Sequence, residues 1–160
     1  MLRPPSGWSL KTILLNGSDV TDAVLSLGTP AQSLKNVEIV LTRQQTHIAG
    51  RVTDDQGRAI GGCAAVAFAV DADKWGDDSR FLATTRSARD GAFDIRGLPA
   101  GDYFVTVADR VREDHEWHDP DVLNALARSA KRVTLIEGQT VEINFQLSSL
   151  NSQGSGGCGR

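Results

Sequence analysis

The sequence predicts an all-β fold, an antiparallel β-sandwich with one short helix in a loop. Apolar and polar residues alternate over short runs, which gives each predicted strand one buried and one solvent-facing side. In the last run, for example, Val141, Ile143 and Phe145 alternate with Glu142 and Asn144. Glycine, asparagine and aspartate separate the runs, and these residues favour the tight turns that join antiparallel neighbours.

The alternating runs place the strands in order along the chain. Gly57 and Gly91 lie between neighbouring runs, where each can adopt the positive φ that a hairpin turn needs. In the run that starts at residue 47, alternation puts His47, Ala49 and Arg51 on the solvent-facing side. The expected strands are 9–15, 37–41, 47–52, 63–70, 81–86, 92–96, 103–107, 131–136 and 140–147.

The helix is expected to begin at Asp119. Its carboxylate can cap the first free N–H groups, Pro120 suits the first helical position, and Asp121 suits the positive end of the helix dipole. Val122, Leu123 and Leu126 then form a narrow apolar stripe that ends near Ala130. We expect this helix to lie in a long loop of the sandwich.

Composition excludes several functional classes. A net charge of -3, with scattered basic residues, gives no reason to expect nucleic acid as a partner. Every apolar stretch is shorter than the roughly 18–20 residues of a membrane helix, and residues 1–5 do not open a signal peptide, so we expect an export signal only upstream. The chain has neither a Gly-x-Ser-x-Gly elbow nor a glycine-rich phosphate loop, so we expect no enzyme activity, no catalytic residues and no cofactor.

A family resemblance rests on the stretch Ala49-Gly-Arg-Val-Thr-Asp-Asp-Gln-Gly-Arg-Ala-Ile60, on Asp90-Gly-Ala-Phe93, on Gly97-Leu-Pro-Ala-Gly-Asp-Tyr103 and on Val141-Glu-Ile-Asn-Phe145. In this order, the segments resemble the bacterial carboxypeptidase regulatory-like domain over residues 46–148. The resemblance implies a transthyretin-like (prealbumin-type), immunoglobulin-like sandwich of about seven strands. It also implies an extracellular, cell-surface or periplasmic location, and it says little about function because such sandwiches have many roles.

Residues 1–45 show a weaker resemblance to the same sequence pattern. The strand Val37-Glu-Ile-Val-Leu41 parallels Val141-Glu-Ile-Asn-Phe145, and the run from Gly7 to Asp22 precedes it. These residues are interpreted either as the C-terminal half of a preceding similar β module or as added strands that pack on the second module. Residues 149–160 are expected to form a flexible Gly/Ser tail.

The candidate site residues each have a structural alternative. Trp75 and Trp117 could stack a sugar ring or anchor a partner, or they could cover the ends of the core. His115 and His118, in a His-x-x-His pattern, could bind a ligand or a metal, or belong to a solvated loop. One group of acidic residues could bind calcium or could simply form a charged loop tip. Its members are Asp71, Asp73, Asp77 and Asp78.

The two cysteines also leave alternatives open. Cys63 begins an apolar run and is expected to be a buried thiol. Cys158 lies in the Gly/Ser tail, where it could form an intermolecular disulfide, and an internal bridge between the two is the other arrangement.

Two functional hypotheses follow. The first is a non-catalytic structural or assembly module of a secreted or cell-surface protein. Its partners would be neighbouring modules or other copies of itself, with strand exchange as one form of association. The alternative is a carbohydrate- or protein-binding accessory module of a larger extracellular enzyme or outer-membrane receptor, with a glycan as one partner.

Overall fold

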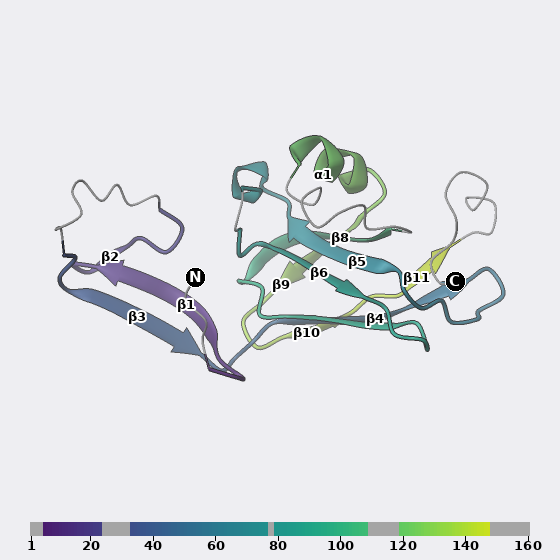
Figure 1. Ribbon diagram of the computed structural model, residues 1–160, viewed down its shortest axis with the longest axis horizontal. Helices are drawn as coiled ribbons and strands as arrows, with labels where there is room; N and C mark the ends of the chain where they lie inside the picture. The colour runs from purple at the N-terminus through teal and green to yellow at the C-terminus, as the bar shows by residue number, and fades with distance from the viewer. Residues whose placement is uncertain (1–4, 24–32, 77–78, 109–118, 148–160) are drawn as a thin grey trace. The chain divides into compact units, whose positions relative to one another are not determined.

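The computed structural model describes residues 5–23, 33–76, 79–108 and 119–147 (Figure 1). The chain divides into two compact units, Met1–Gln45 and Thr46–Arg160. Strand dominates both units in the described ranges, with one α-helix, so the prediction of an all-β fold is confirmed.

The second unit is a sandwich of two sheets. In one sheet β4 is central, with β7 antiparallel on one side and β10 followed by β11 on the other. The strands of this sheet are β4 (His47–Asp54), β7 (Ala92–Arg96), β10 (Thr140–Glu142) and β11 (Phe145–Leu147). The other sheet is antiparallel, and its strands in spatial order are β6 (Leu82–Arg86), β5 (Ala64–Ala69), β8 (Gly101–Ala108) and β9 (Lys131–Leu135).

The core of this unit lies between the two sheets. Ile48 and Val52 of β4 face Ala65 and Ala67 of β5, as the alternation of the sequence predicts. Tyr103 is buried in the same cluster, and its hydroxyl donates to the carbonyl of Pro99 at 2.8 Å, which fixes the corner before β8.

Helix α1 (Pro120–Ala127) lies in the connection between β8 and β9 (Figure 1). Asp119 caps it as predicted, accepting from the N–H of Asp121 at 2.9 Å, but the helix ends at Ala127 rather than near Ala130. Leu123 is fully buried against Val66 and Phe68 of β5. As a result β5 is buried on both faces, which accounts for its continuous apolar sequence.

The final strand differs from its prediction in two ways. It is interrupted at Ile143 and Asn144, and both of its parts pair with β4 in parallel rather than antiparallel. At the interruption the N–H of Ile143 donates to the carbonyl of Ala49, and the side-chain oxygen of Asn144 accepts from the N–H of Arg51 at 2.9 Å. A side-chain amide therefore replaces a backbone acceptor where the ladder breaks.

The first unit contains one antiparallel sheet in the order β2-β1-β3. Its strands are β1 (Ser9–Leu15), β2 (Ser18–Asp19) and β3 (Val37–Thr42). Asn16 and Gly17 both have positive φ (52° and 82°), which suits a two-residue hairpin turn between β1 and β2. A bulge at Lys11 shifts the register of β1 against β3 between Leu10 and Thr12.

Candidate functional site

One face of the first unit's sheet is made of aliphatic side chains. Residues directly opposite one another in an antiparallel pair point to the same side of the sheet. The bulge at Lys11 keeps the aliphatic residues of β1 on the same side as those of β3. The cross-strand pairs on this side, called here the aliphatic face, are Leu10–Leu41, Ile13–Ile39 and Leu15–Val37.

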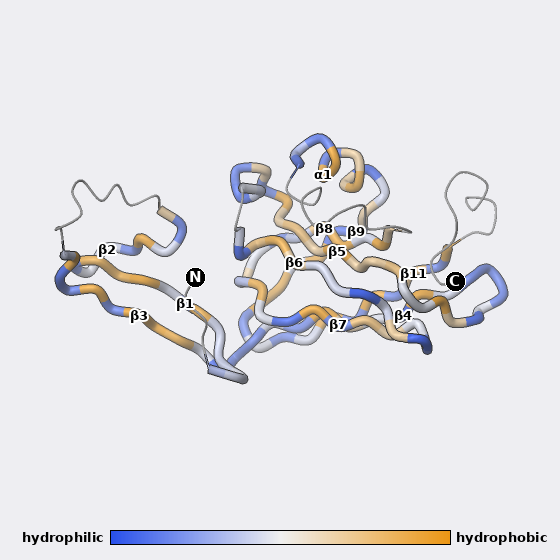
Figure 2. The backbone as a smooth tube through the Cα atoms, viewed as in Figure 1, coloured by the Kyte–Doolittle hydropathy of each residue, from blue (hydrophilic) through white to orange (hydrophobic). Residues whose placement is uncertain are grey.

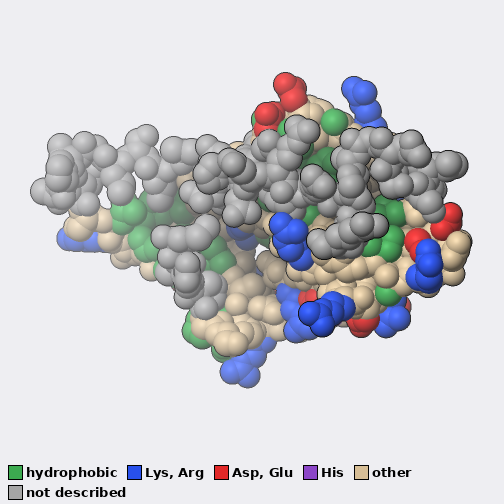
Figure 3. Space-filling view, turned by 45° about the vertical axis from the view of Figure 1, so that its right-hand side comes forward, with side chains coloured by type: hydrophobic (Ala, Val, Ile, Leu, Met, Phe, Trp, Pro, Cys, Tyr) green, Lys and Arg blue, Asp and Glu red, His purple; other side chains and the backbone are tan. Residues whose placement is uncertain are grey.

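The aliphatic face is not buried. In the described part of residues 1–45, every side chain is half-buried or exposed, and Val37 and Ile39 are 42% and 46% exposed. The hydropathy colouring of β1 and β3 shows the apolar character of both strands, and hydrophobic side chains gather on this unit in the space-filling view (Figures 2 and 3). Exposed contiguous apolar surface of this kind marks an interaction site in a soluble protein.

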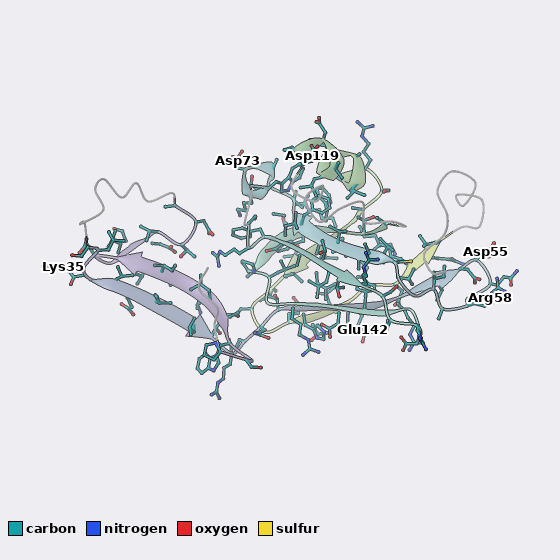
Figure 4. All side chains as sticks on the ribbon, viewed as in Figure 1. Lys35, Asp55, Arg58, Asp73, Asp119 and Glu142 are labelled. Carbon is teal, nitrogen blue, oxygen red and sulfur yellow. The ribbon has the colours of Figure 1, made fainter. Side chains whose placement is uncertain are left out.

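A groove of about 720 Å³, lined by both apolar and charged residues, lies on the second unit. Its lining includes the small residues Ala49 and Ala92 and side chains of both charges, Arg51 and Arg86 against Asp94 and Glu142. Glu142 lies on the outer side of the sheet, away from the core (Figure 4). This groove could hold a small polar or charged ligand.

A charged cluster centred on Asp94, which lines the groove, extends from it. Arg96 donates to both carboxylate oxygens of Asp94, from Nε to Oδ1 at 2.9 Å and from Nη2 to Oδ2 at 2.7 Å. His47 Nε2 lies 2.9 Å from Asp94 Oδ2. The hydrogen bonds from Arg96, followed by the His47 contact, hold the pKa of Asp94 below its ordinary value of 3.8 despite partial burial.

Trp75 is placed in the core rather than on the surface. The ring is 5% exposed, packs edge-on against Phe68 with centroids 5.6 Å apart, and donates from Nε1 to the carbonyl of Ala69 at 2.7 Å. It therefore offers no free face for stacking a sugar, and the alternative that it covers the end of the core describes it correctly.

The acidic candidates on the following loop have a local structural role. Asp71 caps the short 3₁₀ helix η1 (Ala72–Lys74) by accepting from the N–H of Asp73 at 3.2 Å, and it lies 3.7 Å from Lys74 Nζ. Figure 4 shows Asp73 in this turn. Within the described ranges, no cluster of three or more His, Cys, Asp or Glu side chains could hold a metal ion.

The remaining candidates lie outside the described residues: Asp77, Asp78, His115, Trp117, His118 and Cys158. Their binding, metal and intermolecular roles stay predictions. Cys63 is fully buried, as expected, but it is disulfide-bonded rather than a free thiol. In the portion of the chain that can be assessed, no helix has the length and apolarity to span a bilayer.

Sequence reasoning missed the groove. Alternation places Ala49, Arg51 and Glu142 on outward faces, but it cannot show that residues about ninety positions apart become neighbours. That neighbourhood depends on the parallel register of β10 with β4.

Comparison with known proteins identifies the second unit. The model of the carboxypeptidase regulatory-like domain matches residues 47–148, well over half of the chain, and the chain belongs to this family. No curated protein matches the chain.

Solved structures give more distant likenesses. The Bacillus anthracis TIE protein is 10% identical with a TM-score of 0.43, over 72% of this chain and 19% of that protein. The minor pilin of Streptococcus agalactiae is 12% identical with a TM-score of 0.41, over 75% of this chain and 56% of the pilin. A DUF3823 family protein from Bacteroides uniformis is 18% identical with a TM-score of 0.41, over 64% of this chain and 42% of that protein. This chain thus spans only part of each of these proteins, and the likenesses are too distant to bear on function.

Proposed function

We propose that the chain is a non-catalytic structural module of a secreted or cell-surface protein, and that it self-associates through its first unit. The aliphatic face carries this proposal, because the first unit presents one amphipathic sheet with none of its described side chains buried. Fully burying an aliphatic side chain contributes about 1.5–3 kcal/mol. Covering several residues of this face therefore favours association with another copy.

The opposite face of the same sheet has a different character. Its cross-strand pairs are Thr12–Val40 and Leu14–Glu38, and the hydroxyls of Thr12 and Thr21 lie 2.9 Å apart. This asymmetry is typical of a sheet with one solvated face and one face that packs on a second layer.

Light scattering across a range of concentrations tests the proposal. We expect a mass above the 17.1 kDa of a single chain, increasing with concentration and persisting in reductant. The double variant Val37→Thr and Ile39→Thr keeps the β-branched shape but removes apolar surface, so it should lower the mass at a given concentration. The matched control is Val40→Thr, on the opposite face, which should leave the mass unchanged. A wild-type chain that stays monomeric at the highest concentrations contradicts the proposal.

The proposed location outside the cytoplasm rests on two observations. The family resemblance implies it, and disulfides such as that of Cys63 persist in oxidising compartments. Alkylation of the protein under native, non-reducing conditions should leave Cys63 unlabelled until a reductant and a denaturant are added. Labelling by denaturant alone would show a free thiol and remove this support.

A binding role is the second candidate, and the groove on the second unit favours it. Arg51 and Glu142 bring opposite charges to its lining, beside the small residues Ala49 and Ala92. A glycan array tests this function with the wild type and with Arg51→Ala and Glu142→Gln. The control is Arg58→Ala, in a hairpin outside the groove. Binding that both groove variants lose and the control keeps would support the function, whereas the absence of binding by the wild type would end it.

A further inference from the structure

The outer edge of β3 presents a defined set of free backbone groups. In the described residues β3 pairs with β1 alone. The N–H of Asn16 donates to the carbonyl of Asn36 at 3.1 Å, so position 36 directs its backbone groups toward β1. Alternation along an antiparallel strand then directs Glu38 and Val40 toward β1 as well, and directs the N–H and C=O of Val37, Ile39 and Leu41 to the open edge.

This open edge lacks the usual protection against pairing. Exposed edge strands are commonly guarded by lysine, proline or inward-pointing charge. β3 has the sequence Val-Glu-Ile-Val-Leu-Thr, with one charge and no proline. Most edge strands of the second unit carry charge, with Arg86 on β6, Asp94 and Arg96 on β7, and Lys131 and Arg132 on β9, whereas the three-residue β11 carries none.

We propose that a second copy of the chain adds its own β3 to this edge, antiparallel, about a two-fold axis that passes beside Ile39. This inference rests on the proposed self-association and specifies one contact within it, an edge-to-edge joining that extends the aliphatic face across both copies rather than covering it. Ile39 then lies opposite Ile39 of the second copy, and Val37 lies opposite Leu41 in both directions. All the outward backbone groups of Val37, Ile39 and Leu41 find partners, and the two sheets become one.

Side-chain direction selects the type of register. A two-fold axis at a residue keeps the two aliphatic faces on the same side of the joined sheet, because opposite residues share a side. A register shifted by one residue would set Ile39 opposite Val40, join the aliphatic face to the mixed one and lose the two-fold symmetry. It would also leave the outward backbone groups of Ile39 unpaired, because those of Val40 point toward β1. The two exposed apolar side chains of β3, Val37 and Ile39, gain aliphatic neighbours only in the first case.

Charge and length then select Ile39 as the centre. An axis at Glu38 would place two carboxylates directly opposite each other, which is destabilising. An axis at Val40 would set Val37 opposite Arg43, beyond the end of β3. The axis at Ile39 places each Glu38 opposite Val40 and keeps Val37–Leu41 fully paired.

Cysteine crosslinking tests this geometry directly. Opposite residues in a hydrogen-bonded antiparallel pair have Cα atoms about 5.5 Å apart, within the range of a disulfide, whereas diagonal neighbours lie about 7–8 Å apart and beyond it. We expect Ile39→Cys to give a disulfide-linked dimer on mild oxidation, with the 39–39 crosslink identified by mass spectrometry of the peptides. The matched variant Glu38→Cys should give no 38–38 crosslink.

A proline variant provides a second measurement. Ile39→Pro removes an N–H that points to the open edge and leaves the bonds of β3 to β1 in place, and edge strands tolerate proline there. We expect it to lower the mass seen by light scattering while the circular dichroism spectrum stays that of the wild type.

The outcomes separate the two proposals. A wild-type chain that is monomeric at every concentration overturns both of them. A wild-type oligomer in which Glu38→Cys crosslinks and Ile39→Cys does not overturns the register alone, and the same holds if neither variant crosslinks. If the proline variant loses its fold, the crosslinking result decides.

Discussion

Trp75 has a role in the structure that differs from the binding role that its sequence context suggested as one alternative. It follows a loop rich in acidic residues, a setting that is also typical of an exposed binding residue. The structure instead packs its ring against Phe68 and satisfies its indole N–H with the carbonyl of Ala69. The side chain therefore joins β5 to the turn that follows it.

The role of Trp75 predicts a stability effect. Trp75→Ala should lower the free energy of unfolding by about 3–5 kcal/mol, because it removes a buried aromatic ring. Trp75→Phe should cost less, because it keeps most of the packing and loses one hydrogen bond. Urea unfolding measures both values, and a Trp75→Ala variant as stable as the wild type would show that the ring does not pack in the core.

Asp94 predicts a pH dependence with a definite sign. Its pKa is lowered in the folded state, so its contribution to stability is present above its ordinary pKa of 3.8 and is lost as the pH falls through the lowered value. Because the side chain is 42% exposed, the contribution at neutral pH should stay below about 1 kcal/mol.

Comparing Asp94→Asn with the wild type isolates this contribution. Urea unfolding at neutral pH should find the variant less stable, and the difference should shrink at a pH well below 3.8. A difference that is constant over this range would mean that the Asp94 carboxylate contributes nothing that depends on its charge.

At the scale of elements, the placement of β10 and β11 depends on one glycine of β4, Gly50. A Cβ at Gly50 would lie 1.8 Å from the carbonyl oxygen of Ile143 and 2.7 Å from Phe93 Cζ. The chain between β10 and β11 thus runs so close to β4 that only glycine leaves room for it at position 50.

Gly50→Ala should therefore destabilise the second unit, by about 3 kcal/mol or more, because the clash is with backbone rather than a flexible side chain. The matched control is Gly76→Ala, where a Cβ would meet nothing within 4 Å. Thermal unfolding of the two variants measures the difference, and equal melting temperatures would contradict the close approach of Ile143 to Gly50.

The elements were predictable to different degrees, for physical reasons. Alternation and cap chemistry act locally, so the bounds of β1 and β7 and the start of α1 agree with the prediction. The interruption at Ile143 and the parallel pairing of β10 arise from contacts with β4, about ninety residues away in sequence. The brief β2, Ser18–Asp19, is too short for alternation to show.

At the scale of the whole molecule, the two units differ in how they are stabilised. The second unit has two apolar clusters, one between its sheets and one under α1. The first unit has a sheet with an exposed aliphatic face, and a sheet needs a covered hydrophobic face for independent stability. Its stability is therefore expected to depend on association.

Hydrogen exchange can detect this dependence. We expect the amides of β1 and β3 to exchange faster than those of β5, and to slow as protein concentration increases, while those of β5 stay constant. The aliphatic face could be inferred in part from the alternation of Val37, Ile39 and Leu41, but its extension onto β1 depends on the bulge at Lys11. Equal, concentration-independent protection of β1 and β5 would contradict this view.

The parallel placement of β10 and β11 beside β4 has a mechanical consequence. The second unit begins with β4 and its described part ends with β11, and the two strands run side by side in the same direction. Tension applied through the residues before His47 and after Leu147 would pull these strands past each other lengthwise. The bonds of Thr140–Glu142 and Phe145–Leu147 to β4 would then bear the load together rather than opening one at a time. A single-molecule pulling experiment should accordingly find a high, abrupt unfolding force for this unit.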